Sequence, residues 1–421
     1  MPRFSSRSRS CGSRPFATGY GGCRDRGHPR GRLRGGGAVK WFNALHAGAY
    51  RAAFGLRARL RPARKTPIAL GPTSRVLVFT CAGIGDTLTD SVVLKALAET
   101  WPGIYIGAVV HTRRRSLLDH NPFCSKVFPF SKGPFAFARL ARALRADGPW
   151  DAILHLRGND PEPRCLSWLV NPDVTVSVPQ MTKLGHLCGH TIVQPDWDDT
   201  HGVEQTLRIA RYVGADTAEP HLVYQVREAE TAELRARLPG LGVAVDRPHL
   251  VLQIGGGRRA SWRDWPVEHY ASLIRLAAPL GAELILLGGK DNADRAQAIE
   301  KLCEAGDVRR ELERGGSRVR NLAGHISLAH SAALLAGSRA VVSTDTGIMH
   351  LSFAVGARVV ALIHCNNPAH RVGPWGYGDR HRVVQLPRPQ GYKSPADASM
   401  HDLRPEVVAE KLGEIWQPEK N

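Results

Sequence analysis

The 421-residue chain is strongly basic, but its charge is concentrated at one end. Residues 1–70 contain sixteen Lys and Arg against one acidic residue, Asp25, whereas the other 351 residues contain 41 basic and 37 acidic residues. The extension therefore carries +15 of the net charge of +19, and the +4 on the rest of the chain does not favour a nucleic-acid-binding domain. A hydrophobic content of 43% is enough for two domains, and no apolar run approaches the ~18 residues of a membrane span.

The number and spacing of the cysteines indicate whether the chain binds a metal and whether its cellular compartment is reducing or oxidising. The eight cysteines are widely spaced and include no C-x-x-C pair, which argues against a zinc ribbon or a disulfide framework and fits a reducing cytosol. His186, Cys188 and His190 lie close in sequence, but no further ligand accompanies them at a recognisable spacing. We therefore expect no cofactor, no metal site and a cytoplasmic location.

Residues 1–70 form the basic extension. Residues 1–37 are rich in Arg, Gly and Ser and almost lack aliphatic side chains, so we expect them to be disordered, and they lack the apolar core of a secretory signal. Residues 38–66 interleave aromatic and aliphatic side chains with cations. This pattern is typical of a helix lying on an anionic membrane surface, although a solvated arm without a partner accounts for it equally well.

A first domain is expected over residues 71–240, and it opens with a buried strand at 75–80, a glycine loop and a helix. This order suggests a dinucleotide site, but the third glycine of that fingerprint is missing. Asp86 would also repel a pyrophosphate at the helix start. A carboxylate on a glycine loop at the end of a strand is instead well placed to accept a proton, although Asp86 could equally serve only as a helix cap.

The helix after Asp86 is expected to be amphipathic, with Thr89, Asp90, Lys95 and Glu99 on its polar face. Strands and helices then alternate, which indicates a parallel α/β sheet with both faces covered. Further strands are expected at 104–110, 126–128, 151–156 and 174–178, and helices at 114–118, 135–146, 201–213 and 229–238.

A second domain is expected over residues 241–421. Its first strand, at 249–254, runs into Gly255 and Gly256 and then into a loop that includes Arg263 and Trp265. A loop that combines glycine backbone accessible to a ligand with cationic side chains suits an anionic ligand. A charged surface turn is the alternative, which the tryptophan disfavours because an exposed indole is costly without a cover.

A strand at 282–287 is followed by Asp291 and Asp294, which are candidates for holding a ribose or a base. Other strands are expected to end at residue 321 and to cover 359–364, with helices at 269–278, 292–303, 328–336 and 405–416.

The stretch from Ser343 to His350, with the apolar run at 339–342 before it, has the pattern of a buried strand that runs straight into a helix. Asp345 or Thr346 can cap this helix, and Gly347 lets a ligand approach the backbone. Unpaired N–H groups and the positive end of the helix dipole then favour an anion at this point. His350 lies one turn further on the same helix face and can reach that ligand, although an ordinary cap with a core histidine is the alternative.

Taken in order, these motifs resemble glycosyltransferase family 9, the heptosyltransferases of lipopolysaccharide core synthesis, over roughly residues 74–418. The acceptor-side half resembles the family in four places, around Gly85-Asp86, Asn121-Pro122-Phe123, Arg157-Gly158 and His201-Gly202. The donor-side half resembles it at Trp262-Arg263-Asp264-Trp265-Pro266, Leu286-Leu287-Gly288-Gly289, Asn321-Leu322-Ala323-Gly324, Asp345-Thr346-Gly347-Ile348-Met349-His350 and Gly373-Pro374-Trp375-Gly376.

The resemblance implies a GT-B architecture, in which two Rossmann-like domains face each other across a cleft. It also implies inverting transfer from a nucleotide sugar, usually ADP-heptose, to a lipid-linked saccharide acceptor. Asp86 aligns with the family's proposed general base, and Arg263 replaces the lysine that family members commonly carry. The turn at Gln253-Ile254-Gly255-Gly256 departs from the family pattern, which leaves the nucleobase and the sugar open.

Our interpretation is a single displacement in which Asp86 accepts the acceptor proton while Arg263, the helix start at Thr346 and Gly347, and His350 stabilise the leaving diphosphate. The cations and the helix terminus give no reason to require a metal. Two alternatives remain. The same fold could use another donor or a protein acceptor, or the chain could be a nucleotide-sugar-binding module without catalysis.

Overall fold

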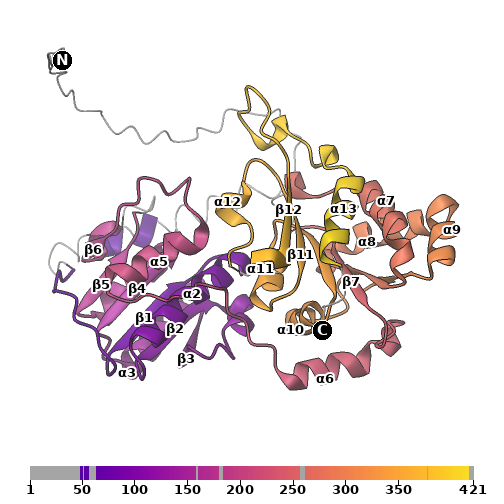
Figure 1. Cartoon of the computed structure of the whole chain (residues 1–421). Coiled ribbons are helices and arrows are strands. Elements are labelled where there is room, and N and C mark those ends of the chain that lie inside the picture. The colour runs from indigo at the N-terminus through magenta and orange to yellow at the C-terminus, as the bar shows by residue number, and fades with distance from the viewer. Residues whose placement is uncertain are drawn as a thin grey trace, which may run out of the picture. The chain divides into compact units, whose positions relative to one another are not determined.

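The computed structural model describes residues 48–50, 52–55, 63–157, 160–179, 184–256, 261–376 and 378–416. The chain divides into two compact units, residues 1–46 and residues 47–421. The first unit, and with it the expected disorder of residues 1–37, lies outside the described residues. Within the second unit, the described residues build two six-stranded parallel sheets flanked by helices (Figure 1).

The first sheet has the strand order β3-β2-β1-β4-β5-β6. Its strands are β1 (Arg75–Thr80), β2 (Tyr105–His111), β3 (Lys126–Phe130), β4 (Ala152–Arg157), β5 (Val174–Ser177) and β6 (His190–Thr191). The accompanying helices are α2 (Ile84–Thr100), α3 (Pro134–Asp147), α4 (Pro161–Val170), α5 (Gly202–Tyr212) and α6 (Glu228–Arg237). Because the order reverses between β1 and β4, the loops after these two strands diverge and leave a crevice.

The second sheet repeats the same plan with the order β12-β11-β10-β7-β8-β9, and its reversal falls between β7 and β10. Its strands are β7 (His249–Gln253), β8 (Glu283–Leu287), β9 (Arg318–Asn321), β10 (Ala340–Thr344), β11 (Val359–Ile363) and β12 (His381–Gln385). Its helices are α7 (Val267–Ala277), α8 (Ala293–Cys303), α9 (Gly306–Gly315), α10 (Leu328–Ala336), α11 (Gly347–Ala354), α12 (Ala369–Val372) and α13 (Pro405–Ile415).

The inner strands are buried on both faces, as their continuous apolar runs predict, whereas β3, β6, β9 and β12 are partly exposed. Along β1, Val76 and Val78 pack into a large cluster that includes α2, α5, α10 and α11, whereas Leu77 and Phe79 pack on the other face with α3. Successive strand side chains point to opposite faces, so one apolar run supplies two layers. The large cluster contains residues of both sheets, and the expectation of one fold built from two Rossmann-like halves is confirmed.

Helix α2 differs from the amphipathic helix that the sequence predicts. Thr89, Asp90 and Lys95 are no more than 5% exposed, because α2 packs on the sheet, on α5 and on α11. Thr89, Asp90 and Lys95, which were expected to face solvent, therefore make their hydrogen bonds inside the protein. Lys95, for example, donates to Glu99 Oε1 at 2.5 Å and to Thr217 Oγ1 at 3.2 Å.

Two glycines allow α2 and α11 to approach each other. A Cβ atom at Gly85 would lie 2.4 Å from Cδ2 of His350, and one at Gly347 would lie 2.6 Å from Cβ of Ile84. Real Cβ atoms do not come so close to other heavy atoms. Gly85 and Gly347 thus have a packing function at the junction of the two sheets that the sequence analysis did not anticipate.

The described part of the extension packs against the first sheet and its helices. Phe54 is buried, and Tyr50 and Phe54 contact Phe137 and Trp168. The Thr66 carbonyl lies 3.2 Å from Nε2 of His190 on the edge strand β6. These two aromatic rings therefore face protein rather than a membrane. Of the helix expected at 38–66, residues 48–50 and 52–55 are helical, residues 63–66 are not, and the other residues lie outside the described part of the chain. Within the described part, no helix combines the length and the apolar character needed to span a membrane.

Several elements were missed or misjudged from sequence. Helix α4 begins with Pro-Glu-Pro, which resembles a turn, and the short strand β6 and the exposed helix α9 carry weak apolar patterns. The helix expected at 114–118 is a 3₁₀ helix, Thr112–Leu117. The division between domains near residue 240 remains a prediction.

Candidate active site

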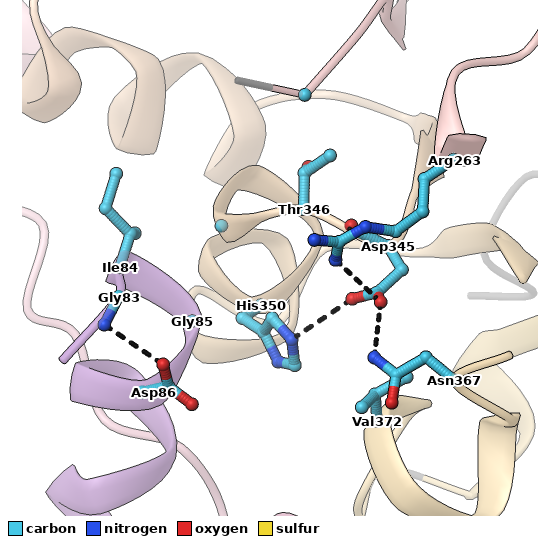
Figure 2. A pocket seen from close by; sticks show the side chains of 12 residues that line it. Gly83, Ile84, Gly85, Asp86, Arg263, Asp345, Thr346, His350, Asn367 and Val372 are labelled. Carbon is cyan, nitrogen blue, oxygen red and sulfur yellow. Dashed lines mark hydrogen bonds and ion pairs between the residues drawn. The ribbon is translucent and has the colours of Figure 1, made fainter. Parts of the chain in front are cut away.

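The two crevices meet in one pocket, of about 280 Å³ (Figure 2). The first sheet contributes the turn after β1, and the second contributes the turns after β7 and β10, both at the carboxyl ends of strands beside a reversal of strand order. Parallel α/β sheets bind ligands at such points. The lining residues are Gly83, Ile84, Gly85, Asp86, Gly256, Arg263, Asp345, Thr346, Gly347, His350, Asn367 and Val372.

Asp86 lies in the first turn of α2, with a side chain that is 47% exposed. Its Oδ2 accepts a hydrogen bond of 3.0 Å from the Gly83 N–H, and its Oδ1 lies 3.7 Å from Nη1 of Arg157. One carboxylate oxygen therefore caps the helix while the group still opens into the pocket. The cap and the proton acceptor, which the sequence presented as alternatives, are compatible in this geometry.

Asp345 does not cap α11 and does not present a free carboxylate to a ligand. The N-cap residue is Thr346, and Asp345 is 3% exposed. Its Oδ2 accepts from Nη1 of Arg263 at 2.9 Å and from Nδ2 of Asn367 at 2.7 Å. Burial would raise the pKa of this carboxyl, but the His350 ring 3.8 Å away and the charge of Arg263 more than offset it and lower the pKa. Of the two residues expected to cap the helix, Thr346 occupies the N-cap position without a side-chain hydrogen bond, and tertiary partners hold Asp345 inward.

Arg263 is fixed at one end by Asp345 and lines the pocket. Its Nη1 also donates to the Asp345 carbonyl at 2.8 Å, and its guanidinium lies 5.0 Å from the ring centre of Trp262. Figure 2 shows Arg263 on the α11 side of the pocket, with the His350 ring between Asp345 and the start of α2. Arg263, Thr346, Gly347 and His350, which the sequence assigns to one site, all line this pocket.

The glycine turn after β7 is held by polar side chains. The Gly256 N–H donates to Oδ1 of Asp264 at 2.9 Å, and a Cβ at Gly255 would lie 2.9 Å from Nδ2 of Asn292. The Gln253 amide is buried; it donates to the Gly255 carbonyl and accepts from Oγ1 of Thr344 at 3.1 Å. Gln253, which departs from the family pattern, thus supports the glycine turn through hydrogen bonds on its buried side.

Trp265 does not cover a ligand. Its side chain is fully buried and its indole N–H donates to the Leu403 carbonyl at 2.8 Å, so it belongs to the core. Asp291 and Asp294 are exposed after β8, and neither lines the pocket. Their contact with a ribose or a base stays a prediction.

Arg157 and His201 lie behind the pocket rather than in its lining. Arg157 donates to the buried Asp90 at 2.8 Å and to the Gly202 carbonyl at 2.6 Å. His201 caps α5, its Nε2 lies 3.1 Å from the Gly373 carbonyl, and its ring stacks on Trp375 at 4.5 Å. Both residues were expected to face the acceptor. In the structure their side chains instead link parts of the protein: Arg157 contacts α2 and α5, and His201 contacts the Gly373 turn.

The His201 ring is expected to make the protein sensitive to acid. Burial lowers the pKa of His201 to about 4, although the Gly373 carbonyl opposes the shift. The unfolded chain, with an ordinary His pKa near 6.5, takes up this proton first, so the stabilisation present above that value is lost as pH falls. The expected loss at pH 5 is about 2 kcal/mol.

Urea unfolding at pH 5 and pH 7.5 checks this expectation. His201→Gln should lose less stability between the two pH values than the wild type does, whereas His186→Gln, at an exposed position, should behave like the wild type. Equal pH dependence in His201→Gln and the wild type would contradict the prediction.

Two polar residues at the site were missed. Asn367 follows β11 at the ligand-binding edge, where an Asn-Asn-Pro turn was the available signal. Asp90 was assigned to a polar helix face, and nothing local indicates that Thr80 and Arg157 enclose it.

The described residues contain no group of three or more His, Cys, Asp or Glu side chains that could hold a metal ion. The His186, Cys188 and His190 cluster does not converge. Cys188 lies 3.0 Å from Nη1 of Arg164, and His190 lies near Tyr212 and Thr66.

Comparisons with known proteins agree with this geometry. The family model described as glycosyltransferase family 9 (heptosyltransferase) matches residues 137–399, more than half of the chain. Lipopolysaccharide heptosyltransferase 2 of Salmonella typhimurium is 23% identical over 369 residues, which cover 82% of this chain and 99% of that protein.

Solved structures show the same fold. The family 9 glycosyltransferase of Veillonella parvula matches with a TM-score of 0.71 and 17% identity, covering 83% of this chain and 99% of that one. The ADP-heptose LPS heptosyltransferase II of E. coli matches with a TM-score of 0.67 and 21% identity, covering 81% and 98%.

The two Rossmann-like halves and the pocket at their strand ends define a protein of the GT-B fold. The sequence match narrows this class: the chain belongs to glycosyltransferase family 9.

Proposed function

We propose that the protein transfers a heptose from ADP-heptose to a saccharide acceptor of the lipopolysaccharide-core type, with inversion and with Asp86 as general base. The observation that carries this proposal is the division of charge across one pocket. An accessible carboxylate comes from the first sheet, and Arg263 with the start of α11 comes from the second. A proton acceptor and an anion site in one cavity suit a displacement that expels a diphosphate.

In the proposed step, an acceptor hydroxyl oxygen attacks the anomeric carbon of the donor. Its proton passes to a carboxylate oxygen of Asp86 as the new C–O bond forms. The bond from the anomeric carbon to the phosphate oxygen breaks, and its electron pair leaves with the nucleoside diphosphate. No oxidant or reductant takes part.

The leaving diphosphate gains negative charge as it departs, and three groups are proposed to stabilise it. Arg263 supplies a fixed positive charge that Asp345 orients. The first N–H groups of α11, at Gly347 and beyond, lack intrahelical partners, and the hydroxyl of Thr346 is buried without a hydrogen-bond partner. His350 can donate from the same wall of the pocket.

A donor panel tests the function. Nucleoside diphosphate release is measured from ADP-heptose and from UDP-, GDP- and dTDP-sugars, with and without a lipopolysaccharide-core extract. Acceptor-dependent release of ADP supports the heptose donor. If only another nucleotide sugar reacts, the donor assignment is wrong and the fold serves a different transfer; if no donor reacts or binds, the enzymatic proposal fails at this site.

We also propose that residues 38–66 bring the enzyme to the anionic surface that carries a lipid-linked acceptor, through their cationic side chains and through apolar side chains other than Phe54, which packs inside the protein. The full chain should sediment with phosphatidylglycerol vesicles at low salt and be released at high salt. Equal sedimentation with neutral phosphatidylcholine vesicles would contradict an electrostatic attachment.

A further inference from the structure

We propose that Arg157 and Asp90 act together as a positioning pair for Asp86. In this arrangement Arg157 orients the Asp86 carboxylate, and Asp90 offsets part of the arginine charge so that Asp86 stays basic enough to take a proton. The inference rests on the proposed function only in assigning the proton transfer to Asp86. Arg157 and Asp90 touch no substrate in this scheme.

Arg157 is held from several sides behind the pocket. It stands at the end of β4, its side chain is 14% exposed, and its Nε donates to Oδ1 of Asp90 at 2.8 Å. Its Nη2 donates to the Gly202 carbonyl at 2.6 Å, and its Nη1 lies 3.4 Å from Oε1 of Gln205. The same Nη1 lies 3.7 Å from Oδ1 of Asp86. Four contacts therefore fix a charged group behind the candidate base.

Asp90 lies one helical turn after Asp86 on α2 and is 1% exposed. Its second oxygen accepts from Oγ1 of Thr80 at 2.7 Å, so both carboxylate oxygens have partners. Burial raises the pKa of Asp90 to about 6, although Arg157 and the Thr80 hydroxyl oppose this shift. At pH 7 the carboxyl is therefore mostly ionised, and it opposes the arginine charge.

Compensation of the Arg157 charge by Asp90 matters because an uncompensated arginine would weaken a neighbouring general base. An opposite charge within ~4–6 Å favours the ionised carboxylate and lowers its affinity for a proton. With Asp90 closer to the guanidinium than Asp86 is, much of the arginine charge is already compensated. Asp86 then keeps an orienting contact without becoming a poor proton acceptor.

Other charged groups surround the pocket and remain in place in the test. His350, Asp345 and Arg263 face it from the second sheet, and His201 lies behind it at the start of α5. None of them bridges Asp86 and Asp90 as Arg157 does.

The test compares Asp90→Asn with Arg157→Gln and Arg157→Lys in the full chain. The pH profile of kcat/KM for ADP release from ADP-heptose is measured between pH 4 and 8, and folding is checked by thermal unfolding. Above about pH 6, where Asp90 is ionised in the wild type, Asp90→Asn exposes Asp86 to the whole arginine charge and should lower the plateau, but it should leave in place the acid limb, where wild-type Asp90 is already protonated. Arg157→Gln should move it to higher pH, and Arg157→Lys should restore the wild-type position.

The limb shift in Arg157→Gln and its reversal in Arg157→Lys are the result that a merely structural effect would not produce. If Asp90→Asn does not fold, the two Arg157 variants carry the comparison. An acid limb that stays in place in all folded variants overturns the proposal.

A second measurement separates this proposal from the function itself. In protein labelled with 13C at aspartate carboxyls, the Asp86 signal is identified by its loss in Asp86→Asn and titrated in each variant. If this titration shifts in the Arg157 variants while Asp86→Asn keeps undiminished turnover, the pair is supported but Asp86 is not the base. An unshifted titration in Arg157→Gln would overturn the pair, whatever the turnover.

Discussion

Replacing Asp86 with asparagine is expected to lower acceptor-dependent diphosphate release by about 10²- to 10⁴-fold, with little change in donor affinity. The amide oxygen of asparagine can still accept from the Gly83 N–H, so the first turn of α2 should stay intact. The amide cannot take a proton from an acceptor hydroxyl. The loss should therefore fall on kcat, while donor affinity, measured by calorimetry, should remain close to that of the wild type.

Glu230→Gln is the matched control for this prediction. Glu230 is also a carboxylate in the first turn of a helix, where it accepts from the Arg227 N–H at 3.2 Å, but it belongs to α6 and does not line the pocket. Its replacement should leave the rate unchanged. Wild-type turnover in Asp86→Asn would remove Asp86 as the base and favour a binding function or another proton acceptor.

Asp345→Ala is expected to destabilise the protein by about 3 kcal/mol and to weaken donor binding at least about tenfold. The carboxylate is buried and holds both Arg263 and Asn367. Its removal leaves a largely buried guanidinium and a side-chain amide without their partner. Arg263 then loses the contact that directs it into the pocket, so diphosphate affinity should fall together with stability.

Urea unfolding and calorimetric titration with ADP check the two parts of this prediction. Asp345→Asn keeps the volume and can still accept one hydrogen bond, so it should fall between the wild type and Asp345→Ala. Asp307→Ala removes an exposed carboxylate in α9 and should change stability by less than about 0.5 kcal/mol. Unchanged ADP affinity in a folded Asp345→Ala protein would contradict a role of Asp345 in orienting Arg263.

Much of the fold can be read from the sequence because each half is built from local signals. Short apolar runs mark strands covered on both faces, and the glycine turns after residues 80 and 253 mark where strands end beside the pocket. The pocket residues Asp86, Arg263, Thr346 and His350 follow from the same signals, since parallel strands bring their carboxyl ends to one edge. Elements with weak apolar patterns, such as α9 and β6, cannot be predicted from these local signals.

The sequence by itself determined the α/β class, the two halves and the residues at the strand ends, because hydrophobic period and turn chemistry are properties of neighbouring residues. Only the tertiary structure decided that Asp345 turns inward to Arg263, that Asp90 is enclosed beside Arg157, and that His201 joins α5 to the Gly373 turn. An apolar pattern tells which side chains avoid water. It cannot tell which distant polar group will meet a carboxylate or an imidazole once helices from two sheets pack together.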